Sequence, residues 1–122
     1  MVSRPLAQEL SELQADFCFA LSDPSRLLII YTLGEHPHNV TDLAAALGLA
    51  QPTASRHLKI LRDRGLVSAI RQGTSVTYHL ADARLLAALD LLRTVMRDRL
   101  AHKADLMVKT GRTGHLMTDS SG

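Results

Sequence analysis

Apolar residues recur at helical spacing along most of the chain, in stretches that proline, glycine and serine–aspartate signals separate. Residues 5–21 place four leucines and a phenylalanine on one stripe, behind a proline that suits a first helical turn. Residues 26–33 are strongly apolar and follow a Ser-Asp-Pro sequence that ends one helix and begins the next. They are too few to cross a membrane, so we expect a buried helix. Gly, Pro and Asn in residues 34–39 predict a loop.

Residues 41–66 predict two short helices joined by a tight turn. Thr41 is a suitable N-cap, because its hydroxyl can accept a hydrogen bond from an unpaired backbone N–H of the first turn. Gly48 lies where the first helix favours a left-handed residue, and Gln51-Pro52 restarts the chain as a second helix. A buried stripe is expected along this second helix, formed by Ala54, Leu58 and Leu61. Two helices with polar and basic residues outward are typical of a helix-turn-helix that places a helix in the DNA major groove.

The pattern changes period beyond Gly65. Residues 66–71 and 75–80 are rich in β-prone side chains, and the turn sequence Gln72-Gly73-Thr74 between them predicts a hairpin. Asp82 is expected to cap a final helix over about residues 83–106, with apolar residues at spacings of four and three.

The order of these elements predicts a mainly α fold with a small β-hairpin. It is that of a winged helix-turn-helix with added N- and C-terminal helices. We expect one DNA-binding domain over residues 1–107. Residues 108–122 are rich in Gly, Ser and Thr without periodicity, which predicts a mobile C-terminal tail.

Composition narrows the class further. The 122 residues fit a single domain, and with only 3% aromatic residues the core must be built from Leu, Ala, Ile and Val. The single cysteine, Cys18, excludes a disulfide framework and a multi-cysteine zinc finger. No secretory signal and no membrane-spanning stretch is evident, so we expect a cytoplasmic protein without a membrane partner.

Charge is distributed unevenly. Residues 1–50 carry two basic and six acidic residues, whereas residues 51–75 carry five basic and one acidic residue. Positive charge on and after the second helix of the pair attracts a phosphate backbone, which favours double-stranded DNA as the partner. A solvated helix face is the alternative.

Candidate DNA contacts lie on this second helix and on the hairpin tip. Arginine can make bidentate contacts to guanine, serine and glutamine can read base edges, and lysine more often contacts phosphate. The candidates on the helix are Gln51, Thr53, Ser55, Arg56, His57 and Lys59. Those on the hairpin are Arg71, Gln72 and Thr74. The sequence leaves open whether His57 faces DNA or the core.

Three segments resemble the successive motifs of the ArsR/SmtB family of bacterial repressors: DPSRLLIIYTL, VTDLAAALGLAQPTASRHLKILRDRGLV and RQGTSVTYHL. The resemblance covers about residues 12–100. It implies a homodimer that binds operator DNA and releases it when a metal, a metalloid or an oxidant binds. Ala50 stands where the family often has a serine, so the reading helix has a weak N-cap.

The first and last helices carry more apolar surface than so small a fold needs, and in the family these helices form the dimer interface. The candidate interface residues are Leu6, Leu10, Leu13, Phe17, Leu85, Leu89, Leu92 and Met96. Packing within one subunit is the alternative for part of the stripe. A two-fold dimer would present two reading helices one turn of DNA apart.

The effector is the least defined part of the resemblance. Residues 40–46 lack the cysteine pair of metal-sensing relatives. Asp82 matches the expected position of a second family site along the last helix, but Arg84 and Val95 replace the histidines of that site, which leaves at most Asp82 and Asp98 as ligands. No cofactor is therefore assigned, although a metal ion effector stays possible.

Other residues offer weaker effector candidates. The pairs His36/His38 and Asp98/His102 could each touch one metal ion, with incidental surface residues as the alternative. Cys18 is the one redox-capable group, and its neighbours Phe17 and Phe19 suggest that it is buried and inert.

Two other classes of function compete with a repressor. Winged helices also serve as protein–protein interaction modules without sequence-specific DNA binding, which the basic segment speaks against. An enzyme would need a phosphate loop or a nucleophile–base pair, and the sequence shows neither pattern.

Overall fold

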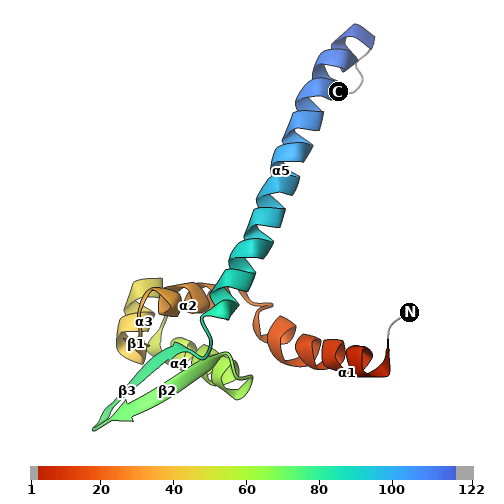
Figure 1. The fold of residues 1–122 in the computed structure, drawn as a ribbon. Helices are drawn as coiled ribbons and strands as arrows, with labels where there is room; N and C mark the ends of the chain where they lie inside the picture. Colours follow the sequence, from red (N-terminus) through yellow and green to blue (C-terminus); the bar gives the residue numbers. More distant parts are fainter. Residues whose placement is uncertain (1–2, 118–122) are drawn as a thin grey trace. The chain divides into compact units, whose positions relative to one another are not determined.

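The computed structural model describes residues 3–117 and confirms a mainly helical winged helix-turn-helix (Figure 1). Its elements are α1 (Arg4–Leu13), a π-helical turn η1 (Gln14–Cys18), α2 (Pro24–Glu35), β1 (His38–Asn39), α3 (Val40–Leu47), α4 (Gln51–Asp63), β2 (Val67–Gln72), β3 (Ser75–Leu80) and α5 (Arg84–Met117). Two units make up the chain, Met1–Leu86 and Ala87–Gly122. The first unit holds the sheet and all helices except most of α5. No helix in the described range 3–117 is long and apolar enough to cross a membrane.

The core lies between α2, α3 and α4. Asp23 caps α2 as predicted, because its carboxylate accepts the N–H of Ser25 at 2.7 Å and that of Arg26 at 3.4 Å. These bonds, led by the one from Ser25, hold the pKa of Asp23 below its usual value. The largest fully buried side chains are Ile29, Ile30, Leu43, Leu58, Leu61 and Leu66. The predicted buried helix over residues 26–33 and the predicted stripe of α4 are both confirmed.

The helix-turn-helix begins earlier than predicted. Asn39, not Thr41, caps α3, since its side-chain oxygen accepts the N–H of Asp42 at 2.7 Å. Thr41 therefore lies inside the helix. Gly48 ends α3 with φ 66°, the left-handed conformation that glycine adopts without strain, as predicted. Ala50 precedes α4 and gives it no side-chain cap, in agreement with the expected weak N-cap.

The wing is a hairpin of β2 and β3 whose two-residue turn is Gly73-Thr74, close to the predicted one. The structure adds a strand where a loop was predicted. His38 and Asn39 pair antiparallel with Tyr78 and Thr77, so the sheet order is β1-β3-β2. Two residues are too few to show alternation, and this is why the sequence did not reveal β1.

The N-terminal helix is not the single regular helix that was predicted. A π-helical turn, Gln14–Cys18, interrupts it, with the N–H of Phe19 bonded to the carbonyl of Gln14. A π turn holds an extra residue, and this breaks the spacing from which one apolar stripe was inferred. Leu6, Leu10 and Leu13 are exposed in the single chain, whereas Phe17 is half-buried.

Helix α5 starts as predicted and runs further than predicted. Asp82 accepts the backbone N–H of Arg84 at 2.9 Å before the first turn. The helix continues to Met117, beyond the expected end near residue 106, so the glycines of this stretch do not end it. The mobility of residues 108–122 stays a prediction, and residues 118–122 lie outside the described range.

Candidate nucleic-acid interface

Helix α4 is amphipathic in the way that a reading helix requires. Ala54, Leu58 and Leu61 are buried. The opposite face exposes most of the predicted contact residues, namely Gln51, Ser55, Arg56 and Lys59, while Thr53 is half-buried. The wing residues Arg71, Gln72 and Thr74 are exposed on the hairpin, at and beside its tip. The first unit therefore presents two polar and basic elements to solvent.

The start of α4 is tied to α3. The side-chain amide of Gln51 donates to the hydroxyl of Thr41 at 3.0 Å, across the turn of the helix-turn-helix. Helix α4 has no side-chain cap, and Pro52 in its first turn has no N–H. The backbone N–H groups that remain unpaired at this end of the helix are available to an anion. Gln51 thus has a role in holding the turn that the sequence did not indicate.

The basic charge of α4 is partly shared within the helix. Lys59 lies 3.0 Å from Asp63, and both side chains are largely exposed. A shallow pocket of about 270 Å³ lies beside this pair, between α4 and β3. Its lining residues include Arg62 and Tyr78, neither of which was among the predicted contacts. The sequence held a signal for Arg62, because it lies about one turn after Lys59 on the same helix. The structure shows that it is exposed.

His57, for which the sequence left open a place at the core or at DNA, contacts a buried residue of α2 in the single chain. It is half-buried, and its Nδ1 is 3.4 Å from a guanidinium nitrogen of Arg26. Arg26 is only 8% exposed and also donates to the backbone carbonyls of Ala20 and Phe19. The carbonyl of Phe19 also accepts from the backbone N–H and the hydroxyl of Ser22, so the guanidinium adds to a helix end that is already capped there and supplies a donor to the carbonyl of Ala20. His57 therefore belongs to a contact between α2 and α4.

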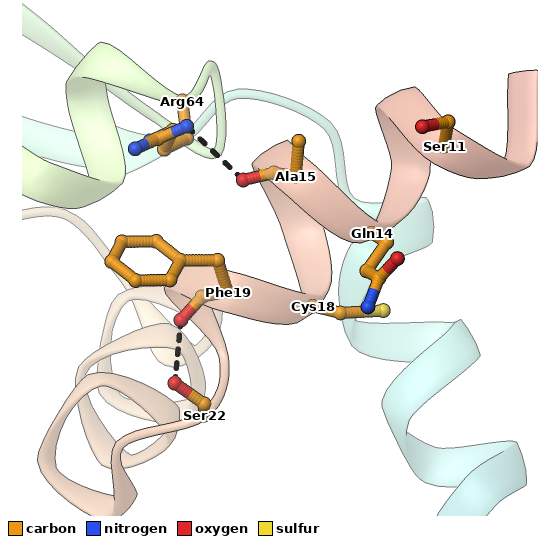
Figure 2. Close-up of a pocket in the computed structure, with 7 residues that line it drawn as sticks. All are labelled: Ser11, Gln14, Ala15, Cys18, Phe19, Ser22 and Arg64. Atoms are coloured by element: carbon orange, nitrogen blue, oxygen red, sulfur yellow. Dashed lines mark hydrogen bonds between the residues drawn. The ribbon is translucent and has the colours of Figure 1, made fainter. Parts of the chain in front are cut away.

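A second arginine joins α4 to the N-terminal helix (Figure 2). Arg64, at the end of α4, donates to the carbonyl of Ala15 at 3.0 Å and contacts the carboxylate of Asp16 at 3.3 Å. Its guanidinium carbon lies 4.9 Å from the ring centroid of Phe19, and that of Arg26 lies 6.0 Å from the same centroid. We call Arg26, Arg64 and the Phe19 ring the arginine clasp. No local feature of the sequence predicts this clasp.

The predicted burial of Cys18 is wrong for the single chain. Its side chain is exposed at an open cavity of about 660 Å³, beside Gln14 (Figure 2). Phe19 is also 52% exposed. Both residues lie in or directly after the π turn, which departs from the regular helix on which their burial was argued.

The candidate metal ligands remain pairs in the structure. The rings of His36 and His38 stack with centroids 4.1 Å apart, and Asp98 and His102 are exposed on α5. Among the residues whose side chains the structure describes, no three His, Cys, Asp or Glu side chains come together in a group suited to a metal ion.

Asp82, which lies at the expected position of the family site on the last helix, is already paired. The guanidinium of Arg84 contacts both carboxylate oxygens, at distances from 2.8 to 3.2 Å. This side-chain pairing, with the backbone N–H of Arg84 second, lowers the pKa of Asp82 to about 2. An arginine that holds both oxygens competes with any cation for that carboxylate.

The candidate dimer residues divide by exposure. Leu85 and Leu89 are half-buried, whereas Leu92 and Met96 are exposed. Other apolar side chains of α5, outside the predicted stripe, are also exposed: Leu91, Val95, Leu100, Leu106, Met107 and Val108.

This fold, with its polar reading helix and wing, defines the class of winged helix-turn-helix transcriptional regulators. The family model for bacterial regulatory proteins of the arsR family matches residues 23–69. The HTH-type transcriptional regulator NmtR of Mycobacterium tuberculosis is 41% identical over 88 residues, which are 72% of this chain and 73% of that protein. The chain belongs to the arsR family.

Further comparisons agree with this assignment. The HTH-type transcriptional repressor SmtB of Mycobacterium tuberculosis is 38% identical over 66% of this chain and 60% of its own length. The solution structure of a homodimeric winged helix-turn-helix DNA-binding domain from Mycobacterium bovis superposes with a TM-score of 0.72 at 31% identity. The superposition covers 84% of this chain and 94% of that one. Membership in a family of transcriptional regulators speaks against an enzymatic function.

Proposed function

We propose that the protein is a homodimeric repressor that binds a pseudo-palindromic operator in the bacterial cytoplasm, with α4 in the major groove. The observation that carries this is the two-sided character of α4. One side is packed into the core by Ala54, Leu58 and Leu61, so the other side, which bears Ser55 and Arg56, is held rigidly toward solvent. A rigid polar and basic helix face is what reading base edges requires.

Individual roles follow from the contacts of each side chain. Arg56 is exposed, and an arginine at this position of a reading helix can contact guanine bidentately. Lys59 and Arg62 would neutralise phosphates, Lys59 after giving up its exposed pair with Asp63. Gln51 positions the turn through Thr41. The wing would contact the backbone or minor groove through Arg71, Gln72 and Thr74.

The dimer is proposed from the apolar residues that the single chain leaves uncovered. Leu6, Leu10 and Leu13 on α1, and Leu92 and Met96 on α5, are all exposed. Exposed apolar residues in this number favour an interaction surface on each of the two helices. The homodimeric state of the similar Mycobacterium bovis domain supports a second copy as the partner.

A metal effector remains compatible with the family, but we propose that it does not use Asp82. Arg84 holds both oxygens of that carboxylate. No ligand-triggered release through this position is expected in the protein as it stands.

The proposal is tested by measuring binding to DNA from upstream of the protein's own gene and to a scrambled sequence, over a series of salt concentrations. A repressor must prefer one sequence, and the logarithm of its binding constant must fall linearly with the logarithm of salt concentration. A footprint should then show two half-sites about ten base pairs apart, centre to centre. Equal, weak binding to both DNAs would instead favour a protein–protein interaction module.

A further inference from the structure

The segment between α2 and α3 carries two histidines in an unusual arrangement. The rings of His36 and His38 stack, with centroids 4.1 Å apart and planes 12° apart. His36 has extended backbone and His38 lies in β1, so the two are at positions i and i+2 of an extended segment, whose side chains share a face. Pro37 between them has a fixed φ, which limits the freedom of one histidine relative to the other.

The hydrogen bonds of these rings define which nitrogens are available. Nδ1 of His36 lies 2.9 Å from the carbonyl oxygen of Pro37, and Nδ1 of His38 lies 2.7 Å from that of His36. A carbonyl oxygen can only accept, so each Nδ1 must carry the proton and donate. In the neutral ring the lone pair then resides on Nε2. Both rings are fixed in the same tautomer by backbone that is itself constrained.

The tautomer of both rings is one that suits a metal-ligating histidine. A metal-ligating histidine almost always donates its other ring N–H to a carbonyl, a carboxylate or water, and that bond fixes its tautomer and orientation. Both His36 and His38 make this bond to backbone carbonyls. In the stack the ring planes are nearly parallel, so the in-plane lone pairs of the two Nε2 atoms do not converge on one point. Both side chains would have to turn about their χ angles to bring Nε2 to about 2.0–2.1 Å from one ion, and their i and i+2 placement on an extended segment puts both within reach of it.

We propose that His36 and His38 form a two-histidine site for a late first-row transition metal ion. Both rings would bind through Nε2, and water would complete the coordination. Imidazole ligands select copper, nickel and zinc over magnesium and calcium, and the order of divalent affinities should place Cu²⁺ first. The proposed ligands include neither Asp82 nor the Asp98/His102 pair of α5.

The position of the site links it to the helix-turn-helix. His38 pairs with Tyr78 of β3, and the next residue, Asn39, caps α3 through the N–H of Asp42. An ion on the two rings would hold the backbone of residues 36–39 in its extended form. It would thereby stabilise both the β1–β3 pairing and the cap of the first helix of the pair.

The experiment measures Cu²⁺, Ni²⁺ and Zn²⁺ affinity of the full-length protein by competition with a chelator, without DNA. His36→Gln combined with His38→Gln should lower each affinity at least about tenfold, because the variant has no imidazole left at this site to bind the ion. His102→Gln is the matched control and should change nothing. Equal affinity in the wild type and the double variant would overturn the site, as would a loss confined to His102→Gln.

A second measurement uses the unmodified protein and so does not depend on how the variants fold. Substoichiometric Cu²⁺ should broaden the ring proton signals of His36 and His38 together, before those of His57, His79 and His102. Broadening of other histidines first would overturn the proposal.

The link to α3 has its own test, by amide hydrogen exchange with and without Zn²⁺. Exchange at the Asp42 N–H should slow on metal addition in the wild type and not in the double variant. Unchanged exchange in metal-loaded protein would overturn the link. Because no DNA is present, this outcome is independent of whether the proposed repressor function holds.

Discussion

The two units of the chain use the same residue type in opposite ways. In the first unit, leucine at helical spacing lies inside: Leu58 is 1% exposed and Leu61 is fully buried. In the second unit, on α5 from Ala87 onward, leucine at similar spacing lies outside, and Leu92 is 64% exposed. Helical periodicity therefore identifies an apolar face without indicating whether the same chain or another molecule covers it.

The difference has a thermodynamic consequence. A core that one chain closes by itself has a stability independent of protein concentration, whereas a face closed by a second copy makes stability depend on concentration. Substitutions in the two units should therefore differ in kind as well as in size.

The largest effect on folding is expected in the core of the first unit. Leu61→Ala removes a fully buried side chain between α4 and its neighbours, and should cost about 2–5 kcal/mol of the free energy of unfolding. Urea unfolding at two protein concentrations should give the same loss. Leu92→Ala is the matched change in the second unit, and its cost should shrink as the protein is diluted, because a face that no second copy covers contributes nothing to the stability of the monomer. A cost for Leu92→Ala that does not vary with protein concentration would contradict the proposal that a second copy of the chain covers this face of α5.

A further test charges the apolar stripe of α5. Leu89→Lys combined with Leu92→Lys should give monomers in sedimentation experiments, because two cations would be forced into an apolar seam. Operator affinity should fall sharply, since a monomer reads only one half-site. Lys103→Gln, on the same helix, should leave the oligomeric state unchanged. A double variant that remains a tight dimer would place this stripe outside the interface.

The polar face of the first unit gives a third comparison, with Arg56 and Arg62 on the same helix. Arg56→Ala should cost about 1–3 kcal/mol on the operator and clearly less on random DNA, if Arg56 reads a base. Arg62→Ala should weaken binding to both DNAs alike and lower the salt slope by about one. Fluorescence anisotropy with both DNAs measures these losses. No loss from Arg56→Ala on either DNA would contradict the placement of α4 in the groove.

The arginine clasp allows a smaller effect within the first unit to be measured. Arg64→Gln removes the contacts of α4 with Ala15 and Asp16 and should cost about 1 kcal/mol, because the guanidinium is partly solvated. Arg62→Gln, two residues earlier and exposed, should cost less than the error of a urea titration. A loss from Arg64→Gln no larger than that from Arg62→Gln would show that the contacts of Arg64 contribute nothing to stability.

Local signals explain what could be predicted from the sequence. The cap at Asp23, the left-handed Gly48 and the glycine turn of the wing each depend on a few adjacent residues. The buried stripe of α4 depends only on helical spacing. For these features, residue type alone decides the geometry.

What could not be predicted depends on contacts between distant segments. Strand β1 exists because residues 38–39 pair with β3, which follows much later in the chain. Arg26 and Arg64 look like ordinary charged residues on helices, since their roles depend on the carbonyls that the N-terminal helix exposes to them. The π turn and the resulting exposure of Cys18 have no sequence signature that we can identify.

The smallest effect concerns the end of the first unit, where Arg84 opens α5 and pairs with Asp82. The pKa of Asp82 is about 2 in the folded protein against an ordinary value of 3.8, chiefly because of the side-chain bonds from Arg84. A lowered pKa in the folded state means that the pairing stabilises the fold above about pH 4 and is lost as the pH falls through about 2. Arg84→Gln should raise the pKa of Asp82 toward 3.8. It should remain somewhat below that value, since the backbone N–H of residue 84 still donates to the carboxylate.

Carboxyl ¹³C NMR titration measures this pKa directly, and Arg93→Gln serves as a control further along the same helix. The control should leave Asp82 unchanged, because Arg93 contacts Asp90 instead. An unchanged pKa of Asp82 in Arg84→Gln would show that the backbone N–H alone sets it. The guanidinium of Arg84 would then contribute little to the charge state of Asp82. Its pairing with Asp82 could not explain why this carboxylate does not bind a metal ion. A raised pKa would instead show that Arg84 supplies the positive charge that this carboxylate would otherwise take from a metal ion.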